Sequence, residues 1–479
     1  MNTLDTLMAG LAFVVAMVRS LHALFLKRDP KSAIGWITVC VLIPFAGPFL
    51  YYLFGINRVR TRAEKLQRRA GSKQKGATPR ADRQTSSPEG SAGIKDPSDR
   101  PSFARVSDIL TDRPLVDGNR IEALHSGEEA YPAMLEAIDG ARRTLFLTTY
   151  IFERNRTGKA FVDALLRAAE RGVDLRVIID GLSDVFHLRW ASRRLKKSGV
   201  PVARFLPPRL IPPTALINLR NHRKILVADG QIGFTGGINI GDSYLAGRHD
   251  NPHRVVDLHF RLKGPVVRQI EEVFIDDWGF ITGTYESVAA AESAPVGSAR
   301  CRVITGGPNE DMDKLAMILT AAVAAARTSV VIMTPYFIPP RGLLVALQTA
   351  ALRGLRVSIV LPEKSDSRVV HWATRNLLWE LLERGVRVYY QPPPFVHTKL
   401  VIVDDGYVHI GSANIDPRSL RLNFELNVEI FDKPLTGTLT RDVKAVIQKS
   451  RAVTLDELDG RPFPVKLRDS LAWLLSPYL

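Results

Sequence analysis

The sequence predicts an α/β protein whose body consists of two similar halves, with hydrophobic membrane helices ahead of them. Three observations lead to this fold class. Beyond about residue 115 the sequence contains an internal repeat, two copies with the same motifs in the same order. Within each copy, amphipathic helix-like stretches alternate with β-branched, strand-like runs. Ahead of both copies lies a run of 23 residues without a charge, which is long enough to cross a bilayer.

Residues 1–56 are expected to embed the chain in a membrane. The charge-free run extends from Ala33 to Gly55, and about 20 apolar residues suffice to span the hydrocarbon core. Aromatic residues near both ends of the run suit the two membrane interfaces. Pro44 and Pro48 interrupt a regular helix, so a kinked span and a re-entrant segment both remain open.

A shorter apolar run, from Leu7 to Val18, comes earlier and is followed by Arg19 and His22. No Lys or Arg precedes this run, which argues against a secretory signal peptide. The sequence leaves open whether residues 7–26 cross the membrane or lie in its interface.

Residues 57–115 have the composition of a linker. They are rich in Arg, Lys, Ser, Gly and Pro and poor in large apolar residues, which predicts a largely disordered segment. Its basic residues are concentrated directly after the hydrophobic run. Such clusters favour the cytoplasmic side of a membrane and attract anionic lipid headgroups, so we expect the body of the protein in the cytoplasm.

The whole chain is basic, because 65 Lys and Arg residues against 49 Asp and Glu residues give a net charge of +16. That balance favours a polyanionic partner, either nucleic acid or an anionic membrane surface. The two cysteines, Cys40 and Cys301, are too few for a disulfide framework.

The first half is expected over residues 116–290 and the second over residues 291–479. Corresponding segments read as a strand, then a helix ended by Gly and followed by a strand, then a second such helix and strand. The paired segments are 141–152 with 326–338, 160–180 with 342–361, and 192–205 with 376–390.

Each half then reaches a His-x-Lys-x4-Asp motif, "HRKILVAD" from His222 and "HTKLVIVD" from His397. Residues two apart in a strand share a face, so the histidine and lysine of each motif are expected to form a site together. The aspartates, Asp229 and Asp404, lie seven positions after their histidines and point to the other face. They are therefore expected to have a structural role.

A return strand brings an asparagine toward each motif. Asn239 follows His222 by 17 residues, and Asn414 follows His397 by the same interval. A two-residue hairpin turn between the strands would set each asparagine opposite its histidine.

Those turns are expected at Gly230-Gln231 and Asp405-Gly406, and Asp-Gly is a preferred dipeptide for such a turn. In the second half the same register sets Ser412 opposite Lys399. Each half is therefore expected to hold a His/Lys/Asn cluster, with Ser412 added in the second.

These clusters have the chemistry that a phosphodiester requires. Lysine supplies a positive charge to phosphate oxygens, and asparagine and serine add hydrogen-bond donors. A neutral imidazole can attack phosphorus while a second, protonated imidazole gives a proton to the leaving group. Asp257 and Glu425 stand at matching places in the two halves as carboxylates that can hold the other imidazole nitrogen. No His, Asp or Glu set repeats at the spacing of metal ligands, so no metal is expected.

A lone His-x-Lys is commonly an exposed strand face. Two copies with the same spacing, the same asparagine and matching carboxylates argue against that interpretation. The paired motifs, together with residues 220–245 and 396–430 around them, resemble the phospholipase D superfamily. Within it the chain is similar to the bacterial cardiolipin synthases, which share the N-terminal hydrophobic region, the fused halves, "GSANIDPRS" (411–419) and "LLSPYL" (474–479).

The resemblance implies two phospholipase D-like halves with mixed sheets, packed as a pseudo-dimer. It also implies a phosphatidyl transfer in which one histidine attacks phosphatidylglycerol, expels glycerol and becomes phosphatidyl-histidine. The terminal hydroxyl of a second phosphatidylglycerol then displaces the enzyme and forms cardiolipin. By analogy with relatives, His222 is the nucleophile and His397 the general acid, then base.

The resemblance implies no cofactor and no metal, anionic phospholipids as partners, no nucleic acid, and a location in the bacterial inner membrane. Its site residues fall into three groups. The catalytic motifs comprise His222, Lys224, Asp229, His397, Lys399 and Asp404; the phosphate-binding residues are Asn239, Ser412 and Asn414; and the histidine-orienting residues are Asp257 and Glu425.

Three alternatives remain open. Water or another alcohol can take the place of the second lipid, which would make the protein a phospholipase D or a different phosphatidyltransferase. A membrane-tethered nuclease would also fit the net charge of +16. A non-catalytic scaffold for anionic lipid is the third, although both motifs are intact.

Overall fold

The computed structural model describes residues 3–27, 30–43, 45–55, 103–208, 219–248, 250–284, 293–307, 313–476 and 479. The chain divides into two compact units, Met1–Leu66 and Gln67–Leu479. The first unit holds the hydrophobic helices and the second is the body of the protein.

The N-terminal unit contains α1 (Thr3–Leu26), α2 (Pro30–Leu42), α3 (Ala46–Leu50) and the π-helical turn η1 (Tyr51–Gly55). Among the described helices, α1 alone is long and apolar enough to cross a membrane, over Leu7–Leu26. It continues through Arg19 and His22 because both polar side chains find partners inside the unit. The Arg19 guanidinium lies over the ring of Tyr52, and His22 Nδ1 is 2.8 Å from the Tyr51 hydroxyl oxygen.

The run from Ala33 to Gly55, which the sequence favours as the span, is not one helix. Helix α2 ends at Leu42 and α3 begins at Ala46, with Phe45 before it at a φ of 67°. A left-handed backbone angle cannot continue an α-helix. Pro48 lacks an amide hydrogen and is accommodated in the first turn of α3. The membrane-spanning length therefore lies in α1, ahead of the predicted run.

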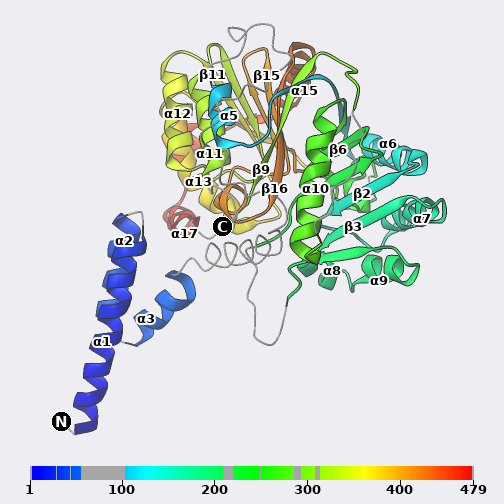
Figure 1. The fold of residues 1–479 in the computed structure, drawn as a ribbon. Coiled ribbons are helices and arrows are strands. Elements are labelled where there is room, and N and C mark those ends of the chain that lie inside the picture. Colours follow the sequence, from blue (N-terminus) through cyan, green and yellow to red (C-terminus); the bar gives the residue numbers. More distant parts are fainter. Residues whose placement is uncertain are drawn as a thin grey trace. The chain divides into compact units, whose positions relative to one another are not determined.

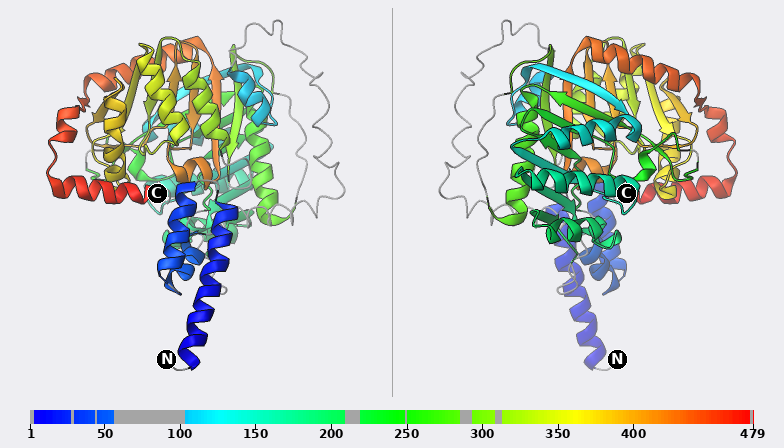
Figure 2. Two further views of the ribbon diagram at one scale, coloured as in Figure 1. Left: turned by 90° about the vertical axis from the view of Figure 1, so that its left-hand side faces the viewer. Right: turned by 90° about the vertical axis from the view of Figure 1, so that its right-hand side faces the viewer.

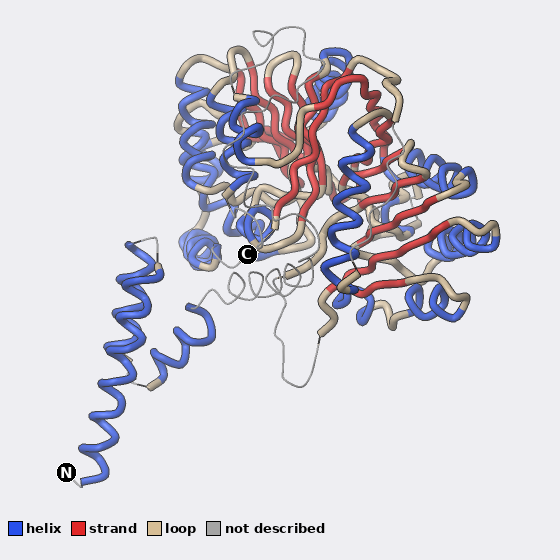
Figure 3. The backbone as a smooth tube through the Cα atoms, in the orientation of Figure 1, coloured by secondary structure: helices blue, strands red, loops and turns tan. Residues whose placement is uncertain are grey.

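A single sheet of 15 strands runs through the body (Figures 1 and 3). The strands of the first half are β1 (Val116–His125), β2 (Thr144–Thr149), β3 (Asp174–Asp180), β4 (Val202–Phe205), β5 (Ile225–Ala228), β6 (Ile232–Gly236) and β8 (Leu258–Lys263). Those of the second half are β9 (Ala299–Gly306), β10 (Ser329–Met333), β11 (Arg356–Pro362), β12 (Arg387–Gln391), β14 (Leu400–Val403), β15 (Tyr407–Gly411), β16 (Glu425–Phe431) and β17 (Arg451–Ala452). A separate two-stranded sheet pairs β7 (Val255–Val256) with β13 (Phe395–Val396).

The two halves repeat one strand order on either side of the β1–β9 junction. Outward from it, the first half runs β1-β8-β6-β5-β2-β3-β4 and the second runs β9-β16-β15-β14-β10-β11-β12. In both halves the last three strands of this shared order are parallel to one another and the others are antiparallel; in the second half β17 adds an antiparallel strand outside β12. The body is therefore a pseudo-dimer of two mixed sheets, as the resemblance implies.

Helices cover the faces of both sheets (Figures 2 and 3). The first half contributes α6 (Ser126–Gly140), α7 (Arg156–Glu170), α8 (Gly181–Phe186), α9 (Trp190–Lys197), the 3-10 turn η4 (Asp242–Tyr244) and α10 (Val266–Thr282). The second contributes α11 (Lys314–Ala324), α12 (Arg341–Leu352), α13 (Arg368–Leu382), α14 (Pro417–Arg421), α15 (Lys433–Gln448), α16 (Leu455–Asp459) and α17 (Phe463–Leu474).

One hydrophobic core joins the halves. It contains Val227 and Phe260 from the first half and Val303 and Val408 from the second, all of them buried. Each half also has its own core beneath its helices. The shared core includes Ile225 and Val396, the sequence neighbours of the motif residues Lys224 and His397, so it adjoins the candidate site.

Helix α5 (Ala104–Leu110) forms at the end of the segment expected to be a linker. Beside it, the fully buried guanidinium of Arg302 lies 2.6 Å from a Glu429 oxygen, and the Ser107 hydroxyl donates to the same carboxylate. This part of the expected linker is thus ordered against the second half. Residues 56–102, the rest of that segment, lie outside the described residues.

Candidate active site

The two histidines are positioned by backbone hydrogen bonds that cross between the halves. The His222 amide donates to the carbonyl oxygen of Phe424 at 2.9 Å, and the His397 amide donates to that of Val256 at 2.8 Å. The second contact belongs to the β7–β13 ladder, and a matching isolated bridge links residues 221 and 424. Each histidine therefore lies beside the residue that immediately precedes a carboxylate of the opposite half.

Each imidazole is consequently held by a carboxylate from the other half. His222 Nδ1 is 3.1 Å from Glu425 Oε2, and His397 Nδ1 is 2.7 Å from Asp257 Oδ2. Both carboxylates have fully buried side chains. With Nδ1 engaged, Nε2 of each ring is the nitrogen available to a substrate. The sequence predicts the two carboxylates but contains no signal for this exchange between halves.

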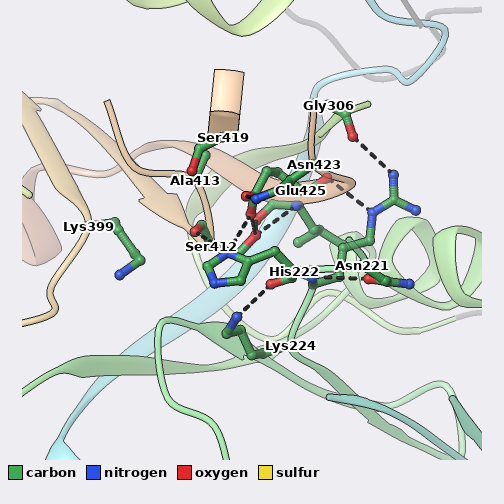
Figure 4. Close-up of polar contacts among 12 residues, drawn as sticks. Asn221, His222, Lys224, Gly306, Lys399, Ser412, Ala413, Ser419, Asn423 and Glu425 are labelled. Atoms are coloured by element: carbon green, nitrogen blue, oxygen red, sulfur yellow. Dashed lines mark hydrogen bonds and ion pairs between the residues drawn. The ribbon is translucent and has the colours of Figure 1, made fainter. Parts of the chain in front are cut away.

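Lys224 and Lys399 lie on two sides of the His222 ring (Figure 4). Each ammonium group donates to the carbonyl oxygen of its own histidine, at 2.7 Å from Lys224 and 2.5 Å from Lys399. Burial lowers the pKa of Lys224 to about 7 and that of Lys399 to about 8. The two ammonium groups therefore share one buried site, where an anion would offset their mutual repulsion.

Burial also shifts the titration of the imidazoles and their partners. It lowers the pKa of His222, and together with the charges of Lys399 and Lys224 it holds the pKa of His397 well below its usual range. Burial raises the pKa of Asp257 to about 7. Both imidazoles are thus neutral near neutral pH while the site holds no anion, which is the protonation state of a nucleophile.

The three residues predicted to bind phosphate are placed differently. The Ser412 hydroxyl donates to Glu425 Oε2 at 2.5 Å, beside His222 (Figure 4). Asn239 uses its amide to donate to the Tyr244 hydroxyl at 2.7 Å. The side-chain oxygen of Asn414 is buried and has no hydrogen-bond partner among the described residues. Ser412 thus sits at the histidine pair, whereas the Asn239 amide is already engaged by the protein.

Asp229 and Asp404 lie at the far ends of β5 and β14 from the histidines. The Asp229 carboxylate accepts backbone N–H groups of residues 142–144, and that of Asp404 accepts those of residues 327–329. Each clamps the start of the neighbouring strand. The structure does not bring either carboxylate to the imidazoles.

The predicted hairpin register is wrong by one residue in both halves. Ala228 pairs with Ile232, and Val403 pairs with Tyr407, so each turn has three residues rather than two. The extra turn residue is the motif aspartate, which adopts a φ of 55° in both copies. Asp tolerates this left-handed conformation, and its contacts with the neighbouring strand hold it there. Neither regular ladder extends as far as the histidines.

Two tyrosines that the sequence reasoning did not select lie against the imidazoles. The Tyr150 ring is edge-on to His222 with centroids 5.3 Å apart, and Lys224 Nζ lies 5.5 Å from the same ring's centroid. Tyr244 is similarly placed near His397, with a centroid distance of 6.3 Å. The repeat gives no signal for Tyr150, because the matching position of the second copy is Pro335, as the equivalent bridges of Phe152 and Phe337 show.

Buried ion pairs that the sequence does not predict hold the backbone on both sides of His222. Arg220 pairs with Asp180 at 3.3 Å, and Arg223 pairs with Asp277 at 2.5 Å. Asp180 also accepts the amide N–H of Asn221 at 3.1 Å. These partners are distant in sequence, so no local pattern relates them. Within the described ranges, no group of three or more His, Cys, Asp or Glu side chains could hold a metal ion.

Comparisons with known proteins agree with this geometry. The family model "Cardiolipin synthase, PLD-like domain" matches residues 134–278 and 319–447, and "Phospholipase_D-nuclease N-terminal" matches residues 11–55. The major cardiolipin synthase ClsA of Bacillus subtilis is 31% identical over 484 residues, covering 100% of both chains. Cardiolipin synthase A of Pseudomonas entomophila is 31% identical over 98% of this chain and 97% of its own.

Among solved structures, the phosphatidylserine synthase of Haemophilus influenzae has the same fold in its body. It superposes with a TM-score of 0.58 at 19% identity, covering 79% of this chain and 100% of its own. The sequence matches, by contrast, extend over the hydrophobic N-terminus as well as both halves. The chain therefore belongs to the cardiolipin synthase family of phospholipase D-like proteins.

Proposed function

We propose that this chain is a cardiolipin synthase that joins two phosphatidylglycerol molecules, with release of glycerol. The observation that carries the proposal is the reciprocal pairing of His222 with Glu425 and of His397 with Asp257, beside two buried lysines. Two oriented imidazoles allow one to attack phosphorus while the other handles the proton.

In the first step His222 Nε2 attacks the phosphorus of phosphatidylglycerol. A P–N bond forms, the P–O bond to the glycerol headgroup breaks, and the imidazolium of His397 gives its proton to the departing alkoxide. Lys224 and Lys399 supply positive charge to the non-bridging oxygens as charge develops on them. The product is phosphatidyl-histidine and free glycerol.

In the second step the neutral His397 takes the proton from the terminal hydroxyl of another phosphatidylglycerol. The oxygen attacks phosphorus, the P–N bond to His222 breaks, and cardiolipin leaves. His222 returns to its neutral state and His397 is again protonated. No electron donor or nucleotide is needed, because one phosphodiester replaces another.

The two carboxylate contacts support the proposed division of roles. Asp257 is the closer partner, at 2.7 Å from His397. Glu425 lies farther from His222, at 3.1 Å, and also accepts the Ser412 hydroxyl. The closer carboxylate stabilises an imidazolium better, which suits the acid–base role for His397. An anionic phosphodiester would offset the lysine charges that keep this ring neutral in the free site.

The test supplies the purified full-length protein, in vesicles, with phosphatidylglycerol as the sole lipid substrate. Mass spectrometry of the products should find cardiolipin and glycerol in equal amounts. Phosphatidic acid as the main product would assign the protein to phospholipid hydrolysis. Absence of any lipid product, with cleavage of added nucleic acid, would assign it to the nucleases.

We also propose that the body faces the cytoplasm. Basic residues are concentrated directly after the hydrophobic N-terminal segment, and such clusters are retained on the cytoplasmic side. A thiol placed at Leu352, whose side chain is 67% exposed, should react with a membrane-impermeant reagent only after the inner membrane is opened. Reaction in intact spheroplasts would contradict this orientation.

A further inference from the structure

Helix α17 carries its large apolar side chains on the outside of the body. Phe463, Leu467, Leu471 and Leu474 recur at intervals of four, four and three residues and so share one face. Their exposed fractions are 75%, 47%, 55% and 63%, respectively. No described residue covers this stripe, and a contiguous exposed apolar face marks an interaction surface.

The inward face of α17 has the opposite composition. Asp469 is fully buried, and its carboxylate forms ion pairs with Arg461 at 2.6 Å, Arg468 at 2.7 Å and Arg375 of α13 at 3.5 Å. Ala472 is the apolar contact on this side, in a cluster with residues of α13. The helix is therefore attached to α13 by polar contacts, including the Arg375 ion pair and a hydrogen bond from Ser470 to Asn376 at 3.1 Å, and by a small side chain. Its leucines are not needed for that attachment.

A second group of exposed apolar side chains lies in the first half, at the turn between α8 and α9. Phe186 and Leu188 are 75% and 72% exposed. Leu188 and Arg189 both have left-handed backbone angles, with φ of 55° and 54°. Such strained residues persist where the surrounding structure holds them and are concentrated at functional sites. The turn thus holds two large apolar side chains in solvent at a conformational cost.

Both features lie close to the candidate active site. Helix α8 begins directly after Asp180, whose carboxylate accepts the amide N–H of Asn221, the neighbour of His222. Helix α17 packs through Ala472 into a cluster with Tyr336, which interacts electrostatically with Tyr244, the tyrosine beside His397. In Figures 1 and 2, α8 and α17 lie at the lower end of the body.

We propose that the α17 stripe and the α8–α9 turn together form a surface that docks the body on an anionic bilayer. Exposed basic side chains accompany both features: Lys466 on α17, and Arg193, Arg194, Lys196 and Lys197 on α9 and directly beside the turn. Apolar groups inserted at the headgroup level with basic groups around them are the pattern of interfacial membrane binding.

The basic side chains around the α17 stripe and the α8–α9 turn also argue against a second copy of this chain as the partner that binds there. Two copies meeting through this surface would bring like charges together, in a chain with a net charge of +16. An anionic lipid surface is complementary instead. The same chain carries a helix of membrane-spanning length, so a bilayer is always within reach of the body. Docking would hold the two histidines near the headgroup phosphates of lipids that remain in the bilayer.

The direct test places an environment-sensitive fluorophore on Leu471→Cys in the full-length protein, reconstituted into phosphatidylglycerol-containing vesicles. The matched control is Leu352→Cys, which replaces an exposed leucine at the C-terminal end of α12. The native thiols Cys40 and Cys301 are buried, and labelling of the unsubstituted protein provides the blank. The Leu471 probe should shift to shorter wavelength and be quenched by lipid-attached quenchers, whereas the Leu352 probe should show neither effect.

A second experiment measures the activity of two double variants. One combines Leu467→Ser with Leu471→Ser, and the other combines Phe186→Ser with Leu188→Ser. Each pair should raise the apparent KM for vesicle lipid about tenfold or more, with little change in kcat. Leu352→Ser should behave as the unsubstituted protein. A Leu471 probe that stays as hydrated as the control overturns the proposal, and so does quenching of that probe only by a second, quencher-labelled copy of the protein. The probe readout does not depend on turnover, so entry into the bilayer without cardiolipin formation contradicts the proposed function and leaves the docking surface standing.

Discussion

The imidazoles of the site are neutral because they are buried beside two cations, and binding of an anionic substrate should change their protonation. A phosphodiester carries one negative charge to Lys224 and Lys399, where burial has lowered both lysine pKa values. The anion favours the charged forms of the lysines and of one imidazole. Substrate binding is therefore expected to be accompanied by proton uptake at neutral pH.

The pH dependence of catalysis follows from this. In the free enzyme the lysines lose protons as the pH rises through about 7 for Lys224 and about 8 for Lys399, so kcat/KM should fall over that range. Bound phosphate raises the lysine pKa, so the alkaline limb of kcat should lie at higher pH. Initial rates measured from pH 5 to 10 at low and saturating lipid test this. Coincident alkaline limbs near pH 10 would contradict it.

Removing the proton donor should separate the two steps. With a substrate whose leaving group needs no proton, such as a p-nitrophenyl phosphodiester of a diacylglycerol, His397→Ala should release one equivalent of p-nitrophenol per site and retain a lipid adduct. His222→Ala should release none, because it lacks the nucleophile. Stopped-flow absorbance and intact-protein mass spectrometry provide the measurement. An adduct on the His222→Ala protein alone would exchange the two roles.

The motif aspartates act at the level of the strand they join rather than at the imidazoles. Asp404→Ala removes the acceptor for backbone N–H groups of residues 327–329 and puts a less tolerant residue at a φ of 55°. The free energy of unfolding should fall by about 2–3 kcal/mol. The activity per folded molecule should persist. Denaturant titration alongside turnover checks both, and a large loss of kcat in the folded variant would assign Asp404 to the chemistry.

The same aspartates explain which part of each hairpin can be predicted. Continuous apolar runs rich in β-branched residues mark β5 and β14, and the two strand–helix–strand copies mark the sheet. The three-residue turn is not visible in the local pattern, because Asp404 is held in it by a strand more than 70 residues away. For the same reason the α8–α9 turn and the exchange of carboxylates between halves could not be predicted: both depend on tertiary contacts.

Helix α5 joins the body through a buried network that the composition of the linker does not suggest. Arg302 and Glu429 are both fully buried, and Ser107 of α5 donates to the same carboxylate. Removing Glu429 leaves the buried guanidinium with the half-buried Asp108, at 2.6 Å, as its remaining acidic partner, so Glu429→Leu should destabilise the body by about 3 kcal/mol. Glu429→Leu with Arg302→Met should recover most of that loss, as measured by thermal unfolding. Equal destabilisation in the single and double variants would argue against the pair.

At the scale of the whole molecule, the duplicated halves are interdependent because each supplies the carboxylate for the histidine of the other. The backbone ladders beside the site enforce this, since the His222 and His397 amides bond to Phe424 and Val256 across the junction. Neither half contains a complete His–carboxylate pair. This accounts for why both halves are kept in one chain, joined by a shared core and a continuous sheet.

The exchange between halves can be tested by the step that each carboxylate serves. Because Asp257 contacts His397, the proposed proton donor, Asp257→Asn should spare the burst with a p-nitrophenyl substrate and slow turnover of phosphatidylglycerol by about 100-fold or more. Because Glu425 contacts the nucleophilic His222, Glu425→Gln should slow the burst itself. Pairing within each half requires the opposite assignment, with Asp257→Asn slowing the burst and Glu425→Gln sparing it. The burst rate of these two variants therefore reports directly which half orients which imidazole.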